Sequence, residues 1–336
     1  MIHALKGMMF LKLKQIACVA VAAYGICALA LLSGCQQQSA PSEGTADTQL
    51  MKEAAEGVSE DESEPFYALI VGNDSRIGTT QIENDNYADG TGRSDTMMLA
   101  RIEPKTYQVT LVTIPRDTEA TLNGSVIKIN EIFRQGGIEA AAEEVENLTG
   151  VHVQYYLDMG FVQFENFVNQ IGGITASVPI DLELKDIVNG GKIELSAGTQ
   201  ELDGSQALVL ARVRKLYAAD IEACRQIQDR QIVEVAIKQV ASDPANAAAH
   251  VDALIGNVDT NWPVDKLANL VSDFAMNADK IEVLSGTGPY VGDFMEEHDG
   301  MWLVPRDAAT WKKVMEVVDQ GGDPTTVVPL PEVTAA

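Results

Sequence analysis

Three short apolar runs, each beside a polar segment that carries arginine and aspartate, constrain the fold of this chain most strongly. They are FYALIVG (66–72), TMMLARI (96–102) and QVTLVTI (108–114). Their length and composition predict buried strands, and EPKT (103–106) predicts a turn between the second and the third. Further strands are expected at 155–159, 173–178 and 281–285, and helices at 138–149, 161–170, 203–210, 226–240, 265–274 and 306–318. This mixture without strict alternation predicts a single α/β domain with helices on both faces of a sheet.

The N-terminus has the features of an export signal. Three lysines precede Ile16–Gly34, nineteen residues without a charge, which as a helix would be roughly 28 Å long, close to the thickness of a bilayer core. The run ends in LSGC (32–35), which resembles the bacterial lipobox and predicts acylation of Cys35. The alternative is an uncleaved membrane helix. Either one places the remaining chain on the extracytoplasmic face of the cell membrane, anchored to it.

The charge of the chain excludes one large class of partners. Lys and Arg total 24 against 49 Asp and Glu, for a formal net charge of −25. Such a surface repels nucleic-acid phosphate, so we expect no nucleic-acid partner. Residues 36–64 hold eight acids and one lysine, a composition that predicts a disordered linker.

The arginines gather in a few polar segments. Seven of those after residue 35 fall in NDSR (73–76), GRSD (92–95), PRD (115–117) and the stretch 212–230. If strand 66–72 runs in the same direction as strand 108–114, then Asp74, Asp95 and Asp117 share one edge of the sheet with the arginines beside them. Arginine binds phosphate through two parallel hydrogen bonds, and carboxylates share Mg²⁺ with phosphate oxygens. The alternative is that these aspartates cap turns and the arginines merely pair with them.

Several segments, in this order and spacing, resemble the LytR-CpsA-Psr family. They are VGNDSR (71–76), GRSDTMMLARIEPKTYQVTLVTIPRDT (92–118), KINEIF (128–133), GGIEAA (136–141) and LVLARVRK (208–215). The resemblance implies an extracytoplasmic α/β/α sandwich with a mixed central sheet and a lipid-binding pocket. It also implies a phosphotransferase that moves glycopolymers, such as teichoic acid or capsule, from a polyprenyl-pyrophosphate carrier to peptidoglycan.

The resemblance further implies roles for individual residues. Asp74 and Asp95 match the positions associated with Mg²⁺ (or Mn²⁺). Arg116, Asp117, Arg212 and Arg214 are expected to be catalytic, with Asp117 or Asp95 as candidate general base. Substrate binding is expected of Arg76, Arg93, Lys128, Arg225, Arg230 and Gln231. The prenyl chain needs a dry tunnel, which we expect the helices of 138–170 and 223–240 to line.

The predicted organisation has five parts. Residues 1–35 form the signal or anchor, 36–64 the linker, 65–241 the catalytic domain, 242–320 its C-terminal completion and 321–336 a loose tail. Two other functions remain open for the same pocket. One is hydrolysis of a polyprenyl pyrophosphate, and the other is non-catalytic binding of anionic lipids by a lipoprotein.

Overall fold

The computed structural model describes residues 63–80, 92–214 and 221–331. The predicted anchor, Cys35 and all of the acidic linker except its last two residues lie outside this part of the chain. Among the described residues, no helix has the length and apolar character needed to cross a bilayer.

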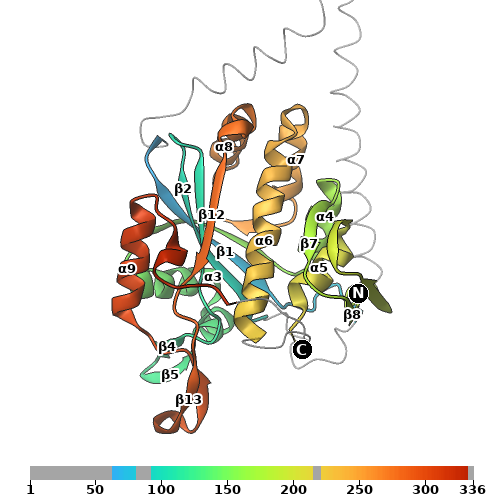
Figure 1. Ribbon diagram of the computed structural model, residues 1–336. Helices are drawn as coiled ribbons and strands as arrows, with labels where there is room; N and C mark the ends of the chain where they lie inside the picture. Colours follow the sequence, from blue (N-terminus) through green and yellow to red (C-terminus); the bar gives the residue numbers. More distant parts are fainter. Residues whose placement is uncertain (1–62, 81–91, 215–220, 332–336) are drawn as a thin grey trace, which may run out of the picture. The chain divides into compact units, whose positions relative to one another are not determined.

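A mixed six-stranded sheet forms the centre of the domain (Figure 1), in the order β11-β6-β1-β2-β3-β12. The three apolar runs are the adjacent strands β1 (Phe66–Asn73), β2 (Ser94–Glu103) and β3 (Gln108–Thr113). Because β2 is antiparallel to both neighbours, β1 and β3 point the same way, as the sequence argument required. The sheet is completed by β6 (Val153–Met159) and β12 (Glu282–Thr287), both parallel to their neighbours, and by β11 (Asp259–Thr260).

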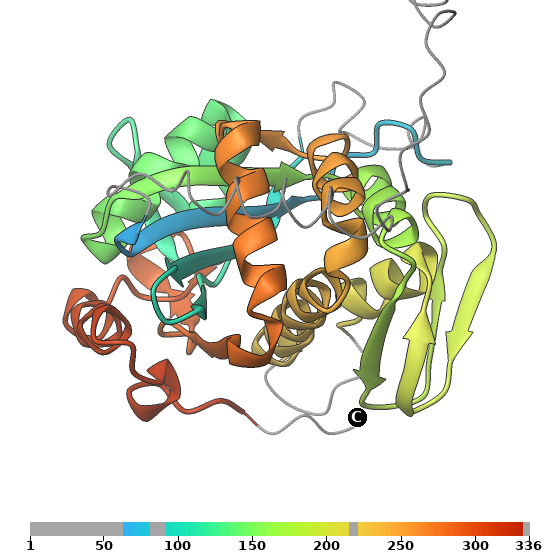
Figure 2. The same ribbon diagram turned by 90° about the horizontal axis from the view of Figure 1, so that it is seen from above.

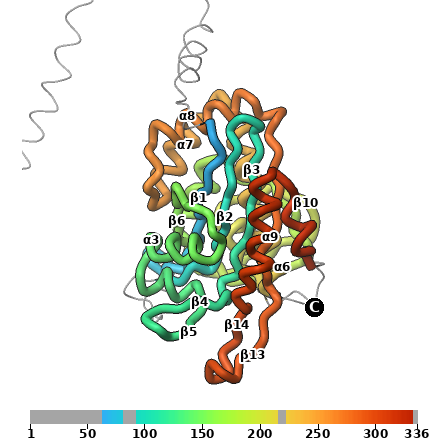
Figure 3. The backbone as a smooth tube through the Cα atoms, turned by 90° about the vertical axis from the view of Figure 1, so that its left-hand side faces the viewer, coloured from blue at the N-terminus to red at the C-terminus, as the bar shows by residue number. Residues whose placement is uncertain are grey.

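Helices cover both faces of this sheet, which confirms the α/β/α arrangement. Leu69 and Leu99 point to one face and pack against α3 (Ile129–Thr149) and α9 (Ala308–Asp319). Both helices lie in front of the central strands in Figure 3. The alternate residues Ala68 and Ala100 point to the opposite face, toward α6 (Ile221–Ala241), α7 (Ala247–Ile255) and α8 (Val264–Met276).

A smaller layer lies beside the central sheet and has its own apolar cluster. Its helices are α4 (Phe161–Gln170) and α5 (Gly204–Arg212). Its strands form two separate pairs, seen together in yellow-green in Figure 2. One pair is β7 (Ile174–Val178) with β10 (Gly198–Leu202), and the other is β8 (Leu182–Lys185) with β9 (Lys192–Leu195).

Two more hairpins lie outside this layer. One is β4 (Glu119–Leu122) with β5 (Ser125–Lys128), and the other is β13 (Asp293–Met295) with β14 (Met301–Leu303).

Several expectations about these elements need correction. Helix α3 begins at Ile129 rather than at 138, with a break at Gly137, where φ is 74°. Helix α6 begins at 221, five residues before the amphipathic pattern that predicted it. The segment 321–331 is not loose, because Val328 is buried in the core on the α3/α9 face and Pro324 packs on the backbone of Gly286 in β12.

Candidate active site

The ends of β1, β2 and β3 bring the predicted polar segments to one edge of the sheet. The chain leaves β1 at Asn73 and enters β2 at Ser94, and these two residues face each other in the register. The backbone N–H of Asp74 donates to the carbonyl of Arg93 at 3.0 Å, and the backbone N–H of Arg93 donates to Oδ1 of Asp74 at 2.6 Å. These bonds fix the carboxylate of Asp74 beside the start of β2.

Asp95 is held between two arginines. Nη1 of Arg116 donates to its Oδ1 at 2.6 Å, and Nη2 of Arg214 lies 3.1 Å from its Oδ2. Burial by itself would raise the pKa of Asp95, but the charges of Arg214 and Arg116 outweigh burial and hold the pKa below its ordinary value. Asp95 is therefore an anchor for arginines and a weak base.

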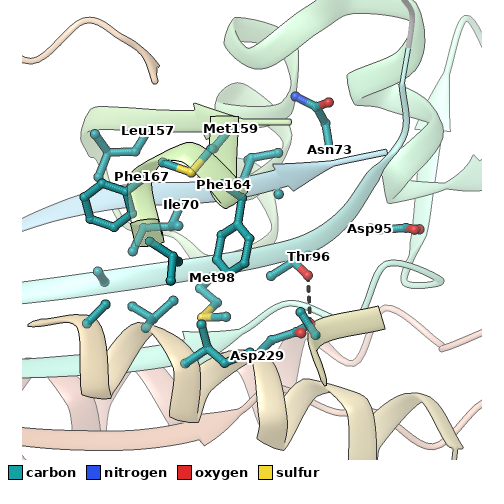
Figure 4. A pocket seen from close by; sticks show the side chains of 18 of the residues that line it. Ile70, Asn73, Asp95, Thr96, Met98, Leu157, Met159, Phe164, Phe167 and Asp229 are labelled. Atoms are coloured by element: carbon teal, nitrogen blue, oxygen red, sulfur yellow. Dashed lines mark hydrogen bonds between the residues drawn. The ribbon is translucent and has the colours of Figure 1, made fainter. Parts of the chain in front are cut away.

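Helix α6 adds two acids to this edge that were not anticipated from the sequence. Nη1 of Arg225 donates to Oδ2 of Asp229 at 2.5 Å, and Arg225 also pairs with Glu222. Asp229 accepts a further hydrogen bond from the hydroxyl of Thr96 at 2.7 Å, drawn as a dashed line in Figure 4. The spacing of three and four residues from Arg225 is the usual signal for such pairs. It was missed because the helix was expected to begin only at Gln226.

Arg212 and Arg76 have a different environment, because both lie close to the aromatic ring of Phe161. Their guanidinium carbons lie 5.3 and 5.4 Å from the centre of the Phe161 ring, a distance at which cations are attracted to aromatic faces. Within the part of the chain that the structure describes, Arg212 forms no ion pair, and its Nη1 donates to the backbone carbonyl of Lys185 at 3.3 Å. Burial and the nearby charge of Arg76 lower the pKa of Arg212 to about 10. A desolvated cation beside a second cation favours an anionic ligand near both.

These side chains form the polar mouth of a deep cavity of about 790 Å³. It is lined by six of the predicted arginines and both predicted metal aspartates: Arg76, Arg93, Arg116, Arg212, Arg214, Arg225, Asp74 and Asp95. Beyond the mouth the walls are apolar, and Figure 4 shows Ile70, Met98, Leu157, Phe164 and Phe167 around the same space. The lining continues to Ile102 on β2, seven residues from Asp95, or roughly 23 Å at the rise of a strand.

The helices that form this cavity agree only in part with the prediction. Helices α4 and α6 line it as expected, together with α5, α7 and α8. Helix α3, which contains 138–149, packs on the opposite face of the sheet and contributes nothing to the wall. The expectation for that helix was wrong, because hydrophobic spacing shows that a helix has a buried face but not which face of the sheet it covers.

Four of the predicted site residues do not line the cavity. Asp117 pairs with Lys128, whose Nζ lies 2.8 Å from its Oδ1. Arg230 is 2% exposed and donates to the hydroxyl of Thr113 in β3 at 2.6 Å. The side-chain amide of Gln231 fits against the backbone of Ser177 in β7, donating to its carbonyl at 3.1 Å and accepting from its N–H at 3.3 Å.

Two carboxylates at the mouth form the part of the site suited to a divalent cation. Burial raises the pKa of Asp74, and the neighbouring charge of Asp95 raises it further, so a cation near both carboxylates would relieve this repulsion. Within the described ranges, no cluster of three or more His, Cys, Asp or Glu side chains could hold a metal by itself. The pair fits Mg²⁺, which is commonly held by one or two carboxylates and completed by substrate phosphates and water.

Comparison with known proteins finds one matching family and several similar transferases. A model described as the LytR_cpsA_psr family matches residues 31–316. One similar protein is TagV of Bacillus subtilis (strain 168), a polyisoprenyl-teichoic acid–peptidoglycan teichoic acid transferase, which is 29% identical over 273 residues. The match covers 78% of this chain and 66% of TagV, just under two thirds of that relative. The transferase TagU of Halalkalibacterium halodurans is 32% identical over 229 residues, 67% of this chain and 70% of TagU. The crystal structure of B. subtilis TagV superposes with a TM-score of 0.62 at 26% identity, covering 80% of this chain and 99% of that one.

Proposed function

Since the chain belongs to the LytR-CpsA-Psr family, we propose that it transfers a glycopolymer from a polyprenyl-pyrophosphate carrier to peptidoglycan. One observation carries the proposal: a single cavity joins a long apolar tunnel to a mouth lined by six arginines. The apolar part fits a prenyl chain, and the mouth fits the pyrophosphate attached to it. The relatives TagV and TagU, which are polyisoprenyl-teichoic acid–peptidoglycan teichoic acid transferases, support this proposal.

The substrate supplies its own activated bond, so the reaction needs no nucleotide. The oxygen of an acceptor hydroxyl forms a bond to the phosphorus that carries the polymer. The bond from that phosphorus to the bridging oxygen breaks, and polyprenyl phosphate leaves with the electron pair. The hydroxyl proton passes to a base or to solvent. We expect Arg212, Arg116 and Arg214, which line the mouth, to stabilise the charge that develops on the phosphates.

Asp74 and Asp95 are proposed to hold Mg²⁺ (or Mn²⁺) together with the pyrophosphate. When bound, the ion supplies positive charge that neutralises the phosphate oxygens. Neither predicted candidate for the general base is well suited to that role. Asp117, directly after Arg116 in the chain, does not line the cavity and instead forms an ion pair with Lys128 at the end of β5. Asp95 has a lowered pKa and is therefore a weak base.

The test is product analysis with a short-chain polyprenyl-pyrophosphate-linked polymer, with and without soluble peptidoglycan. We expect polymer joined to peptidoglycan, with Asp74→Asn and Asp95→Asn lowering Mg²⁺-stimulated transfer at least about a hundredfold. Glu201→Gln, at an exposed position in β10, is the matched control. Free polymer released at the same rate without acceptor would indicate a hydrolase, and binding without turnover would indicate a non-catalytic lipoprotein.

We also propose that Cys35 is acylated and anchors the domain to the extracytoplasmic face of the membrane. The support is the LSGC sequence at the end of the uncharged run and a reaction that requires access to a membrane-bound lipid. Mass spectrometry of the mature N-terminus should find lipid on Cys35. An intact N-terminal segment in membrane-extracted protein would instead show a transmembrane anchor.

A further inference from the structure

The hairpin of β13 and β14 presents exposed aromatic side chains that the fold does not use. Phe294 and Trp302 face each other across the two strands, with ring centres 5.1 Å apart in an edge-to-face arrangement. They are 66% and 40% exposed, and Val291 just before the hairpin is 73% exposed. We call Val291, Phe294 and Trp302 the hairpin surface. An exposed apolar group of this kind, rimmed by polar residues, is typical of a binding surface.

Backbone hydrogen bonds fix this hairpin to the mouth of the cavity. The N–H of Val304, directly after β14, donates to the carbonyl of Asp117 at 2.9 Å, and the N–H of Glu119 donates to the carbonyl of Val304 at 2.9 Å. Asp117 follows Arg116, whose side chain lies in the mouth. In Figures 1 and 3 the hairpin extends from the same end of the domain as β4 and β5. An acceptor that approaches the pyrophosphate therefore meets the edge from which this hairpin projects.

The charge around the hairpin surface restricts what it can bind. Residues 288–305 contain no lysine or arginine but four acids, Asp293, Glu296, Glu297 and Asp299. These carboxylates repel a phosphate-rich polymer and an anionic lipid surface alike. These carboxylates do not repel an uncharged sugar ring, and the C–H groups on one face of such a ring pack against aromatic side chains.

We propose that the hairpin surface binds the glycan strand of the peptidoglycan acceptor and holds it beside the mouth of the cavity. The proposal rests on the proposed function, which requires such an acceptor at this edge. Trp302 and Phe294 stack on sugar rings and position the strand, and they take no part in the transfer itself.

Tryptophan fluorescence offers a direct test, because Trp302 is exposed whereas Trp262 and Trp311 are buried, at 5% and 1%. Titration with short soluble glycan fragments of peptidoglycan should change the emission of the wild-type chain. Calorimetry should show that Phe294→Ala or Trp302→Ala weakens fragment binding about tenfold or more. Trp302→Phe, which keeps an aromatic face, should retain most of the affinity. Met276→Ala removes another exposed apolar side chain, 41% exposed on α8, and serves as the control.

In the transfer assay, the two alanine variants should raise the KM for acceptor and leave stabilisation by a short-chain polyprenyl pyrophosphate unchanged. Unchanged fragment affinity in both variants would overturn the proposal. So would loss, in these variants only, of binding to phosphatidylglycerol vesicles or of self-association, because the surface would then serve a membrane or a second copy. Fragment binding at the hairpin without transfer by the wild-type chain would contradict the proposed function but not this surface.

Discussion

The arginines at the mouth differ in what holds them. Arg225 forms ion pairs with Asp229 and Glu222. Arg212 donates a hydrogen bond to the backbone carbonyl of Lys185 and makes a cation–π contact with Phe161. The first arrangement stabilises the folded chain. The second leaves the guanidinium available for a ligand.

This difference predicts opposite behaviour in thermal unfolding. Arg212→Ala should leave the Tm of the free protein nearly unchanged but lose stabilisation by a short-chain polyprenyl pyrophosphate. One charge-assisted contact is worth roughly 1.5–3 kcal/mol, or about ten- to a hundredfold in affinity. Arg212→Lys should recover only part of this loss, because lysine lacks the planar fork. Arg225→Ala should instead lower the Tm of the free protein, since it leaves Asp229 buried without its partner, at a cost of roughly 3–5 kcal/mol.

The measurement is a thermal shift for each variant with and without the ligand. Equal ligand stabilisation in Arg212→Ala and the wild-type chain would show that Arg212 serves only the fold. In that case the role implied for it by the family resemblance would be wrong.

Asp158 in β6 gives the domain a pH-dependent stability. Burial raises its pKa to about 6; the hydrogen bond from Asn73 at 2.8 Å lowers the pKa and the charge of Asp259 raises it. The folded protein therefore holds a proton that the unfolded chain has lost between about pH 4 and 6. Stability falls as the pH rises through this window and the buried carboxyl ionises.

Asp158→Asn should remove this dependence. We expect the variant to unfold at a higher temperature than the wild type at pH 8 and at a similar temperature near pH 4, because asparagine stays neutral. Asp259→Asn, at an exposed position, should have a smaller effect in the same direction. Tm measured across this pH range checks the prediction, and a difference between variant and wild type that does not change with pH would refute it.

At the level of the elements, the cavity face of the sheet carries small residues among the larger Ile70, Met98 and Ile102. Ala68, Gly72 and Ala100 lie on this face, toward α6 and α8, whereas Leu69, Val71 and Leu99 belong to the core on the opposite face. The space left over the small residues is bounded by α6, whose Ala236 also lines it. Ala236 is therefore a small residue of the cavity wall, and a larger side chain there would reduce the space for a prenyl chain.

A large side chain in this space should block binding of the prenyl chain but not binding of the pyrophosphate. Ala236→Phe is expected to abolish stabilisation by long-chain polyprenyl pyrophosphate while stabilisation by inorganic pyrophosphate with Mg²⁺ persists. Ala236→Ser, of nearly the original volume, is the control. The measurement is the thermal shift of each variant with each ligand. Undiminished stabilisation of Ala236→Phe by the long-chain ligand would show that the prenyl chain binds outside this cavity.

At the scale of the whole molecule, the C-terminal third closes the domain. Strand β12 extends the central sheet beside β3. The segment after α9 returns across β12 and buries Val328 in the core. The hydroxyl of Tyr290 donates a hydrogen bond to the carbonyl of Pro329 in this segment at 3.0 Å. The chain after residue 320 thus stabilises the sheet edge beside which the hairpin surface projects.

Truncation after Gln320 should therefore destabilise the domain. Burial of one valine side chain contributes roughly 1.5–3 kcal/mol, and the loss of Pro324 from its place on Gly286 adds to this. We expect a Tm lower by several degrees at least. Truncation after Pro331 keeps all of these contacts and is the control, so it should have a higher Tm than truncation after Gln320. Equal Tm values for the two truncations would contradict the packing of residues 321–331.

Local sequence signals were enough to predict several central elements and the edge of the sheet at which the site lies. Short apolar runs, helical periodicity and turn residues are local signals, so β1, β2, β3, α4 and α8 were predicted close to their observed bounds. The turn between β2 and β3 was enough to predict that Asp95 and Arg116 lie at one edge. Placing Asp74 there required the assumption that β1 and β3 run in the same direction, which the structure confirms. The family resemblance supplied the activity, which these local signals do not contain.

Only the tertiary structure decided which of the predicted residues face the cavity. Arg225 and Arg230 lie on one helix, but five residues correspond to about 140° of rotation, so the two point in very different directions. The first reaches the mouth and the second is buried against Thr113 of β3. Which side of a helix or sheet meets a tunnel depends on how distant elements pack, and here α7 and α8, far along the chain from β1 and β2, form its far wall.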